Sequence, residues 1–271
     1  MQSHLFIDNF SSKIATEKVC SGYIVIGENY LQLAVKLQDE LSFIFCKTWY
    51  NSEGNITKEY FDILLLEPAL KQCTHFFVCI DTPKFVEVPT SFLSKENNHL
   101  FFENLQIIES DEQILEQKIS KEITELFVAK KATIQMLKNQ WNDVKILSNS
   151  ACLLTQNMKL VTQNWSLFVH TNQTGFFLSL FEKNKLYLHN FYEMSNEEDV
   201  LYAVMNVMVQ KEIEMKNLQF YLTGFAQNQQ NIYELLSTYI QVQTIENEEM
   251  KKQLFPTHIL FNLYSFMLCA S

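Results

Sequence analysis

The sequence predicts an α/β fold in which one structural unit occurs twice: three hairpin-linked strands, a helix and a further strand. Two observations carry this prediction. Stretches with strand character come in two groups of three, at residues 22–50 and 165–192. Each group is followed by an amphipathic helical stretch and then by an apolar run typical of a central strand. We therefore expect two lobes, each with a mixed sheet of three antiparallel strands plus parallel strands, flanked by helices.

The first copy supplies four strands and one helix. One strand alternates apolar and polar side chains, as a half-buried strand does, and the fourth is continuously apolar. Thr57 can cap the helix between the third and fourth strands, and Phe61 and Leu64 belong to its apolar stripe. The strands are expected at residues 22–27, 30–36, 41–50 and 74–80.

The second copy repeats this order. Ser195 and Asn196 open its helix, in which Val200 and Val204 lie on the apolar face. Its strands are expected at residues 165–170, 176–181, 186–192 and 218–222. The two copies share a pattern and almost no residue identities.

The remaining segments join or flank the two copies. We expect the domains to be an N-terminal segment, residues 1–20, acting as a leader or short cap; a first unit, 21–83; a connecting αβ module, 84–163; and a second unit, 164–271. Within the module, strands are expected at residues 105–108, 126–129 and 144–147, and helices at 131–141 and 150–161. After the second copy we expect a helix near residues 228–239, a strand at 240–243 and a helix from about Thr257.

The charge of the chain argues against nucleic-acid binding. The formal net charge is −10, and all 21 basic residues are lysine. Neutralisation of phosphates dominates affinity for nucleic acids, and arginine is the usual bidentate reader of guanine. We therefore expect no nucleic-acid partner.

The cysteines and the hydropathy pattern predict a cytoplasmic protein. No apolar stretch approaches the roughly 20 residues needed to span a bilayer, and Met1 is not followed by a basic region and an apolar run. The cysteines are scattered without a CxxC pair, so we expect reduced thiols and no metal site. They are Cys20, Cys46, Cys73, Cys79, Cys152 and Cys269.

The order of these elements resembles a known family. After the first triplet, helix and strand come VPTSF at residues 88–92, a strand–helix pair beginning with VKILS at 144–148, and a second triplet from Trp165. Over nearly the whole chain this is similar to the bacterial domain-of-unknown-function family 3822, uncharacterised proteins with the actin-like ATPase (ribonuclease H-like) fold. Pilus-assembly ATPase-like proteins are more distant relatives. The family has no assigned activity, so the resemblance implies a fold and not a function.

The resemblance also implies where a nucleotide site would lie. Active members of the actin-like superfamily hold phosphates between two glycine-rich hairpin loops, in a cleft between the lobes. An Asp at the end of each first strand orients Mg²⁺, and a paired-glycine turn packs on adenine. The matching positions here are Gly27, Glu28, Asn29, Asp81, His170, Asn172, Thr174, Gly175, Thr223 and Gly224.

These positions depart from the active pattern. The first loop keeps one glycine, and its carboxylate, Glu28, lies within the turn. The second loop keeps one glycine and has no carboxylate, and Phe225 replaces the second glycine of the adenosine turn. Asp81 is the remaining candidate carboxylate, although an Asp before Thr-Pro is also a common turn former. Phosphoryl transfer depends on metal and electrostatic help, so we expect a degenerate site.

Two hypotheses follow. The first is a pseudo-ATPase: a non-catalytic scaffold or partner-binding module, with no catalytic residues and no cofactor, whose partner is another protein. The alternative is a divergent ATP-binding protein, ATPase or kinase that uses ATP and Mg²⁺ in the interlobe cleft, with Asp81 and Glu28 as surviving carboxylates. The 22 Phe, 11 Tyr and 3 Trp fit either an exposed interaction patch or aromatic-rich strands.

Overall fold

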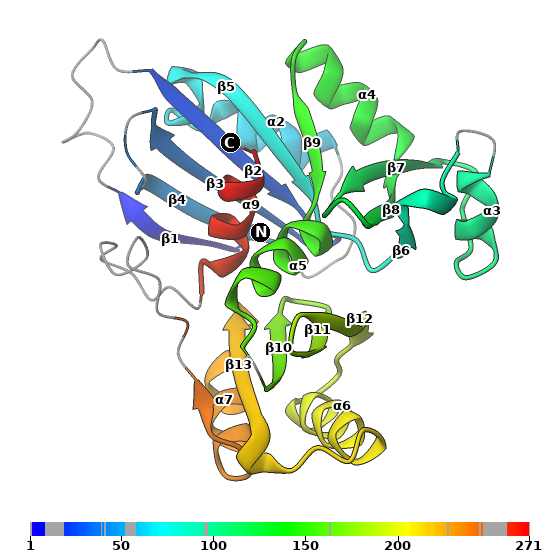
Figure 1. The fold of residues 1–271 in the computed structure, drawn as a ribbon. Coiled ribbons are helices and arrows are strands. Elements are labelled where there is room, and N and C mark those ends of the chain that lie inside the picture. The colour runs from blue at the N-terminus through cyan, green and yellow to red at the C-terminus, as the bar shows by residue number, and fades with distance from the viewer. Residues whose placement is uncertain are drawn as a thin grey trace. The chain divides into compact units, whose positions relative to one another are not determined.

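The chain folds into two compact units in a computed structural model (Figure 1). Unit 1 comprises Met1–Thr155 and Leu263–Ser271, and unit 2 comprises Gln156–Asn262. The structure describes residues 2–8, 19–38, 40, 42–51, 58–94, 97–162, 164–226, 228–243, 245 and 259–270. Within these residues no helix is both long enough and apolar enough to cross a membrane.

Unit 1 is built on a six-stranded mixed sheet. Its order is β1-β4-β3-β2-β5-β9. The first four strands pair antiparallel, whereas β5 pairs parallel with both β2 and β9. The bounds are β1 (Gln2–Asp8), β2 (Cys20–Ile26), β3 (Tyr30–Leu37), β4 (Phe43–Tyr50), β5 (Cys73–Ile80) and β9 (Lys145–Ser148).

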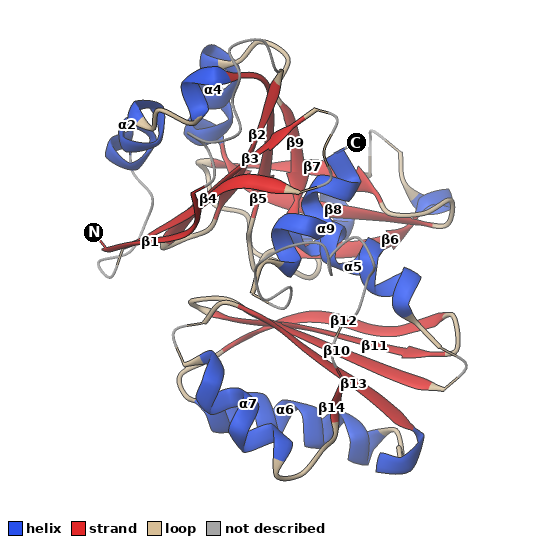
Figure 2. Ribbon diagram, turned by 90° about the vertical axis from the view of Figure 1, so that its left-hand side faces the viewer, coloured by secondary structure: helices blue, strands red, loops and turns tan. Residues whose placement is uncertain are grey.

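Aromatic side chains hold helices on both faces of this sheet. Phe76 stacks on Trp141, which follows α4 (Lys131–Gln140), with ring centroids 4.6 Å apart; α2 (Lys58–Leu66) packs on the same indole through Phe61. The neighbouring residue in β5, Phe77, points to the opposite face, where Tyr23 meets Phe266 of α9 (Phe261–Ala270) at 5.5 Å. Both ribbon views place α2 and α9 on opposite faces (Figures 1 and 2).

A small three-stranded sheet completes unit 1. Its order is β6-β8-β7, with antiparallel pairing throughout. It packs with the short helix α3 (Asn98–Glu103) around Phe102, Val86 and Val128. The other bounds are β6 (Phe85–Pro89), β7 (Glu112–Lys118), β8 (Ile123–Lys130) and the 3₁₀ turns η1 (Leu70–Gln72) and η2 (Thr90–Phe92).

Unit 2 is built on a five-stranded sheet of order β12-β11-β10-β13-β14. Helices α6 (Glu197–Gln210) and α7 (Gln229–Ser237) cover one face (Figure 2), and Val200, Val204 and Ile232 bury their side chains against it. A reciprocal capping box between Asn196 and Asp199 begins α6. The bounds are β10 (Trp165–Thr171), β11 (Gly175–Glu182), β12 (Lys185–Glu193), the 3₁₀ turn η3 (Met215–Asn217), β13 (Leu218–Gly224) and β14 (Val242–Gln243).

The predicted duplication is confirmed by the sheet order. In unit 1 the five strands β4-β3-β2-β5-β9 have the same order and directions as β12-β11-β10-β13-β14 in unit 2. In each unit the antiparallel triplet is extended by parallel strands, which is the expected mixed sheet. Helix α5 (Asn149–Leu160) runs from unit 1 into unit 2.

Three predictions differ from the structure. The N-terminal segment was expected to be a leader or cap, but Gln2–Asp8 is strand β1, which pairs with β4. Without β1, the edge of β4 would expose unpaired backbone groups. Residues 105–108 do not form a strand, because the chain closes the end of α3 there with a Gln106 N–H to Phe102 O bond of 2.8 Å. The strand of this region is β7, at Glu112–Lys118.

The third difference concerns the C-terminal helix. It was assigned to the second copy, yet residues 263–271 belong to unit 1. The physical reason is that Tyr264 and Phe266 pack on Phe43 and Tyr23 of the six-stranded sheet. The helix cap expected at Thr57 and the helix start expected near Thr257 lie outside the described residues.

Candidate functional site

The first predicted loop joins β2 to β3 and is filled by Tyr30. The N–H of Gly27 donates to the carbonyl of Tyr30 at 3.0 Å. A Cβ on Gly27 would lie 2.1 Å from the Tyr30 ring. Asn29 accepts a hydrogen bond on its carbonyl from the N–H of Asn51. Gly27 is therefore required by the Tyr30 ring, and this loop needs no ligand to explain its glycine.

Asp81, the predicted cleft carboxylate, is held by the protein itself. It follows β5, is only 7% exposed, and donates its N–H to Ile26 O at 2.8 Å. Its carboxylate accepts hydrogen bonds from the Tyr30 hydroxyl and from Asn149 Nδ2, the latter at 3.1 Å. Burial, together with the Asp81 charge, raises the pKa of Tyr30 well above its usual value, so the hydroxyl remains a donor. Asp81 thus joins β2, β3, β5 and α5.

Three of the predicted residues line one pocket in unit 1. Gly27, Glu28 and Asp81 lie along a cavity of about 390 Å³, and Asn29 does not. Its apolar lining comes from the ends of strands β2, β5 and β8. Sequence reasoning missed the charged groups at its rim, which are Lys84, Glu109, Glu112 and Lys130.

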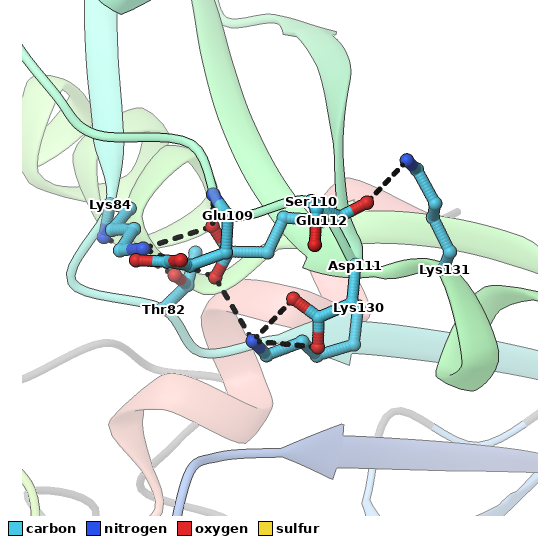
Figure 3. Close-up of polar contacts among 8 residues, drawn as sticks. All are labelled: Thr82, Lys84, Glu109, Ser110, Asp111, Glu112, Lys130 and Lys131. Atoms are coloured by element: carbon cyan, nitrogen blue, oxygen red, sulfur yellow. Dashed lines mark hydrogen bonds and ion pairs between the residues drawn. The ribbon is translucent and has the colours of Figure 1, made fainter.

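The charges at this rim neutralise one another (Figure 3). Lys84 Nζ lies 2.9 Å from Glu112 Oε2, and Lys130 Nζ lies 3.5 Å from Glu112 Oε1 and 3.1 Å from Asp111. Burial raises the pKa of Glu112, but the Glu109 N–H and the two lysines outweigh it and lower that pKa. Both lysines are therefore engaged with carboxylates. Residues Glu112 and Lys130 are opposite each other in the β7–β8 register, so a correct hairpin assignment would have found them.

The second predicted loop, between β10 and β11, is closed by Asn172. Its Oδ1 accepts from the N–H of Thr174 at 2.9 Å, from the N–H of Gly175 at 2.8 Å, and from the Thr174 hydroxyl at 3.1 Å. Its N–H donates to Gly175 O. A Cβ on Gly175 would meet Tyr192 O at 2.1 Å. The backbone amides that a phosphate loop would offer are thus bonded within the loop.

The adenosine-type turn packs on the neighbouring strand. Gly224 has φ +128°, and a Cβ there would lie 2.2 Å from Thr171 O, so both conformation and space require glycine. The N–H of Phe225 donates to the same carbonyl at 3.1 Å. His170 Nδ1 lies 2.9 Å from Thr223 Oγ1, and burial lowers the pKa of His170 to about 3. His170 is therefore a neutral, buried ring.

A pair of acids in unit 1, the buried Glu125 and the partly buried Glu87, was not predicted. Glu87 and Glu125 lie directly opposite each other on β6 and β8, and their carboxylate oxygens are within 4.8 Å. Glu125 is fully buried and accepts a hydrogen bond from Ser150 Oγ at 2.7 Å. Burial, and for Glu87 also the charge of its partner, raises the pKa of both. A strand-centre Glu gives no sequence pattern that reveals such pairing.

The duplicated mixed sheet defines the class: a protein with the actin-like fold, in which the two hairpin loops described above are bonded internally. The chain belongs to the family described as protein of unknown function (DUF3822), whose model matches residues 11–242. No curated protein matches the sequence.

Solved structures share the fold, among them the following two. A protein of unknown function with an actin-like ATPase fold from Bacteroides thetaiotaomicron is 17% identical with a TM-score of 0.72, covering 90% of this chain and 97% of that one. The PilM–PilN type IV pilus biogenesis complex is 10% identical with a TM-score of 0.51, covering 95% and 100%. At these identities the likeness shows the fold alone.

The Tyr30–Asp81 contact is expected to contribute to stability. Replacing Tyr30→Phe removes a donor from a buried carboxyl group and should lower the free energy of unfolding by about 1–3 kcal/mol. Urea denaturation measures this. Tyr233→Phe, on the exposed surface of α7, is the matched control and should change the value by less than about 0.5 kcal/mol. Equal effects of the two substitutions would contradict the assignment.

The Glu87–Glu125 pair predicts a pH dependence of stability. The folded-state pKa values of Glu87 and Glu125 are raised above the ordinary value of 4.5, so the unfolded chain binds fewer protons above that pH. Stability should therefore fall as the pH rises from about 4.5 through neutrality. Glu125→Gln keeps an acceptor for Ser150 and should remove roughly 1 kcal/mol or more of this decline between pH 5 and 8.

Urea denaturation at several pH values checks this prediction. Glu122→Gln, an exposed acid just before β8, is the control and should leave the pH profile as in the wild type. A profile of Glu125→Gln that parallels the wild type would show that the pair is not protonated in the folded state.

Proposed function

We propose that this chain is a non-catalytic member of the actin-like fold that works as a partner-binding module. The observation that carries the proposal is that Asn172 Oδ1 accepts from the Thr174 and Gly175 amides. In an active relative such amides would face phosphate oxygens. A nucleotide would have to replace bonds that the loop already makes.

The first loop supports the same proposal. Gly27 faces the Tyr30 ring, and the Tyr30 hydroxyl binds the carboxylate of Asp81. An Asp that orients Mg²⁺ through water needs free carboxylate oxygens, whereas both oxygens of Asp81 accept hydrogen bonds from the protein. We therefore propose that neither ATP nor magnesium is a cofactor of this chain.

The proposed role in partner binding is in keeping with the fold. One structure with this fold, PilM, is part of a complex with PilN. An actin-like frame can thus serve in a protein assembly. The partner of this chain is proposed to be another protein.

One observation favours the alternative of a divergent ATP-binding protein. Glu28 and Asp81 both line the pocket of unit 1. In that reading Asp81→Ala would abolish ATP turnover while the protein stayed folded. The lysines at the rim oppose it, because Lys84 and Lys130 are paired with carboxylates and offer little uncompensated charge to phosphates.

Isothermal titration calorimetry with Mg·ATP tests the proposal. We expect no saturable heat up to millimolar nucleotide and no phosphate release above buffer. A nucleotide-binding actin-like protein titrated alongside verifies the assay, and circular dichroism verifies that the chain is folded. A micromolar dissociation constant, or turnover that Asp81→Ala abolishes, would overturn it in favour of the divergent ATPase.

A further inference from the structure

A second pocket lies within unit 2 and is lined by residues of α6 and of the ends of β11 and β12. Its volume is about 340 Å³. The strands contribute Phe176 and Tyr192, which are opposite each other in the register and stack with ring centroids 5.4 Å apart. Phe176 is fully buried beneath this stack, so Tyr192 is the strand residue that offers an aromatic surface to the pocket.

The helix contributes one continuous side. Its lining residues recur at the i, i+3, i+4, i+7 and i+8 spacing of a single helical face. Tyr202 stands among them with 73% of its surface exposed, so its ring is open to solvent. The lining residues of α6 are Asp199, Tyr202, Ala203, Asn206 and Val207.

The segment that leads from β12 into α6 is acidic, and its residues Glu193 and Asp199 line the pocket. Residues 193–199 contain four acids and no base. The Asp199 carboxylate caps α6, because it accepts hydrogen bonds from the N–H groups of Ser195 and Asn196. Glu193 has no such role: it is exposed, ends β12 and precedes the helix, and it lines the pocket. The pocket thus combines aromatic faces with a carboxylate that helix capping does not explain.

Such a surface is complementary to a guanidinium group. Guanidinium is planar and weakly hydrated, stacks on aromatic faces, and binds carboxylates through paired donors; an ammonium group is a more strongly hydrated point charge. These 271 residues contain no arginine, so none of their own segments supplies this group.

We propose that this pocket, the α6–β12 pocket, binds an arginine side chain presented by a separate protein. The inference rests on the proposed role as a partner-binding module and names the chemistry of the contact. Aromatic residues and arginine are both enriched at protein interfaces, which agrees with an exposed Tyr202 beside Tyr192 and Glu193.

NMR titration of the full chain with capped tripeptides tests the proposal. The probes are acetyl-Leu-Arg-Leu-amide and the same peptide with citrulline, which keeps the shape of arginine without its charge, or with lysine. We expect the arginine peptide to shift amides of residues 192–207 saturably in the millimolar range and less so as salt rises. The citrulline peptide should produce little change, and the lysine peptide should bind more weakly.

Two variants locate the contact. Tyr202→Ala and Glu193→Gln should each weaken the affinity for the arginine peptide by about two- to fivefold. Tyr233→Ala and Glu234→Gln, exposed residues of α7, are the matched controls and should leave the affinity unchanged. Spectra of the free variants show whether each remains folded.

Three results would each overturn the proposal: equal binding of the arginine and citrulline peptides, shifts confined to amides outside residues 192–207, or no saturable shift at 10 mM peptide. That concentration is roughly the limit for a specific single-residue contact. Equal binding of the lysine peptide would overturn its restriction to arginine. None of these results depends on nucleotide. Failure here is therefore distinct from failure of the calorimetric test with Mg·ATP.

Discussion

The buried carboxylate of Asp81 is the constraint on which unit 1 depends. A buried carboxyl group without partners is costly, so the surrounding chain must supply donors. The Tyr30 hydroxyl and Asn149 Nδ2 do so from β3 and α5. The Tyr30 ring then needs the space above Gly27. A single requirement thus fixes the hairpin, the end of β5 and the start of α5.

In unit 2 the hairpin loop between β10 and β11 is closed by the side chain of Asn172. Asn172 supplies one acceptor for two backbone amides and a hydroxyl. Gly175 and Gly224 make room for backbone atoms of Tyr192 and Thr171. The two units therefore share a sheet order, while each has filled its loop with a different side chain. The fold is compatible with such divergence because sheet packing does not rely on the loops.

The sequence was most informative about local periodicity. It predicted the first strand triplet in part because residues 30–36 alternate, and the parallel strand that follows because residues 76–80 are apolar. It failed for β1, whose place depends on the free edge of β4. It missed the Glu112–Lys130 pair because β7 was not assigned as a strand. It could not reveal the buried Glu125, because the contact of β6 with β8 arises only in the folded sheet. The candidate loops were located, but the side chains that fill them required the structure.

Hydrogen exchange of the two loops with and without Mg·ATP tests the central claim most directly. If Asn172 and Tyr30 occupy the positions that phosphates would take, the amides of residues 27–30 and 172–175 should exchange at the same rates in both conditions. Protection of both loops by Mg·ATP, absent with magnesium alone, would contradict the account and identify a working nucleotide site.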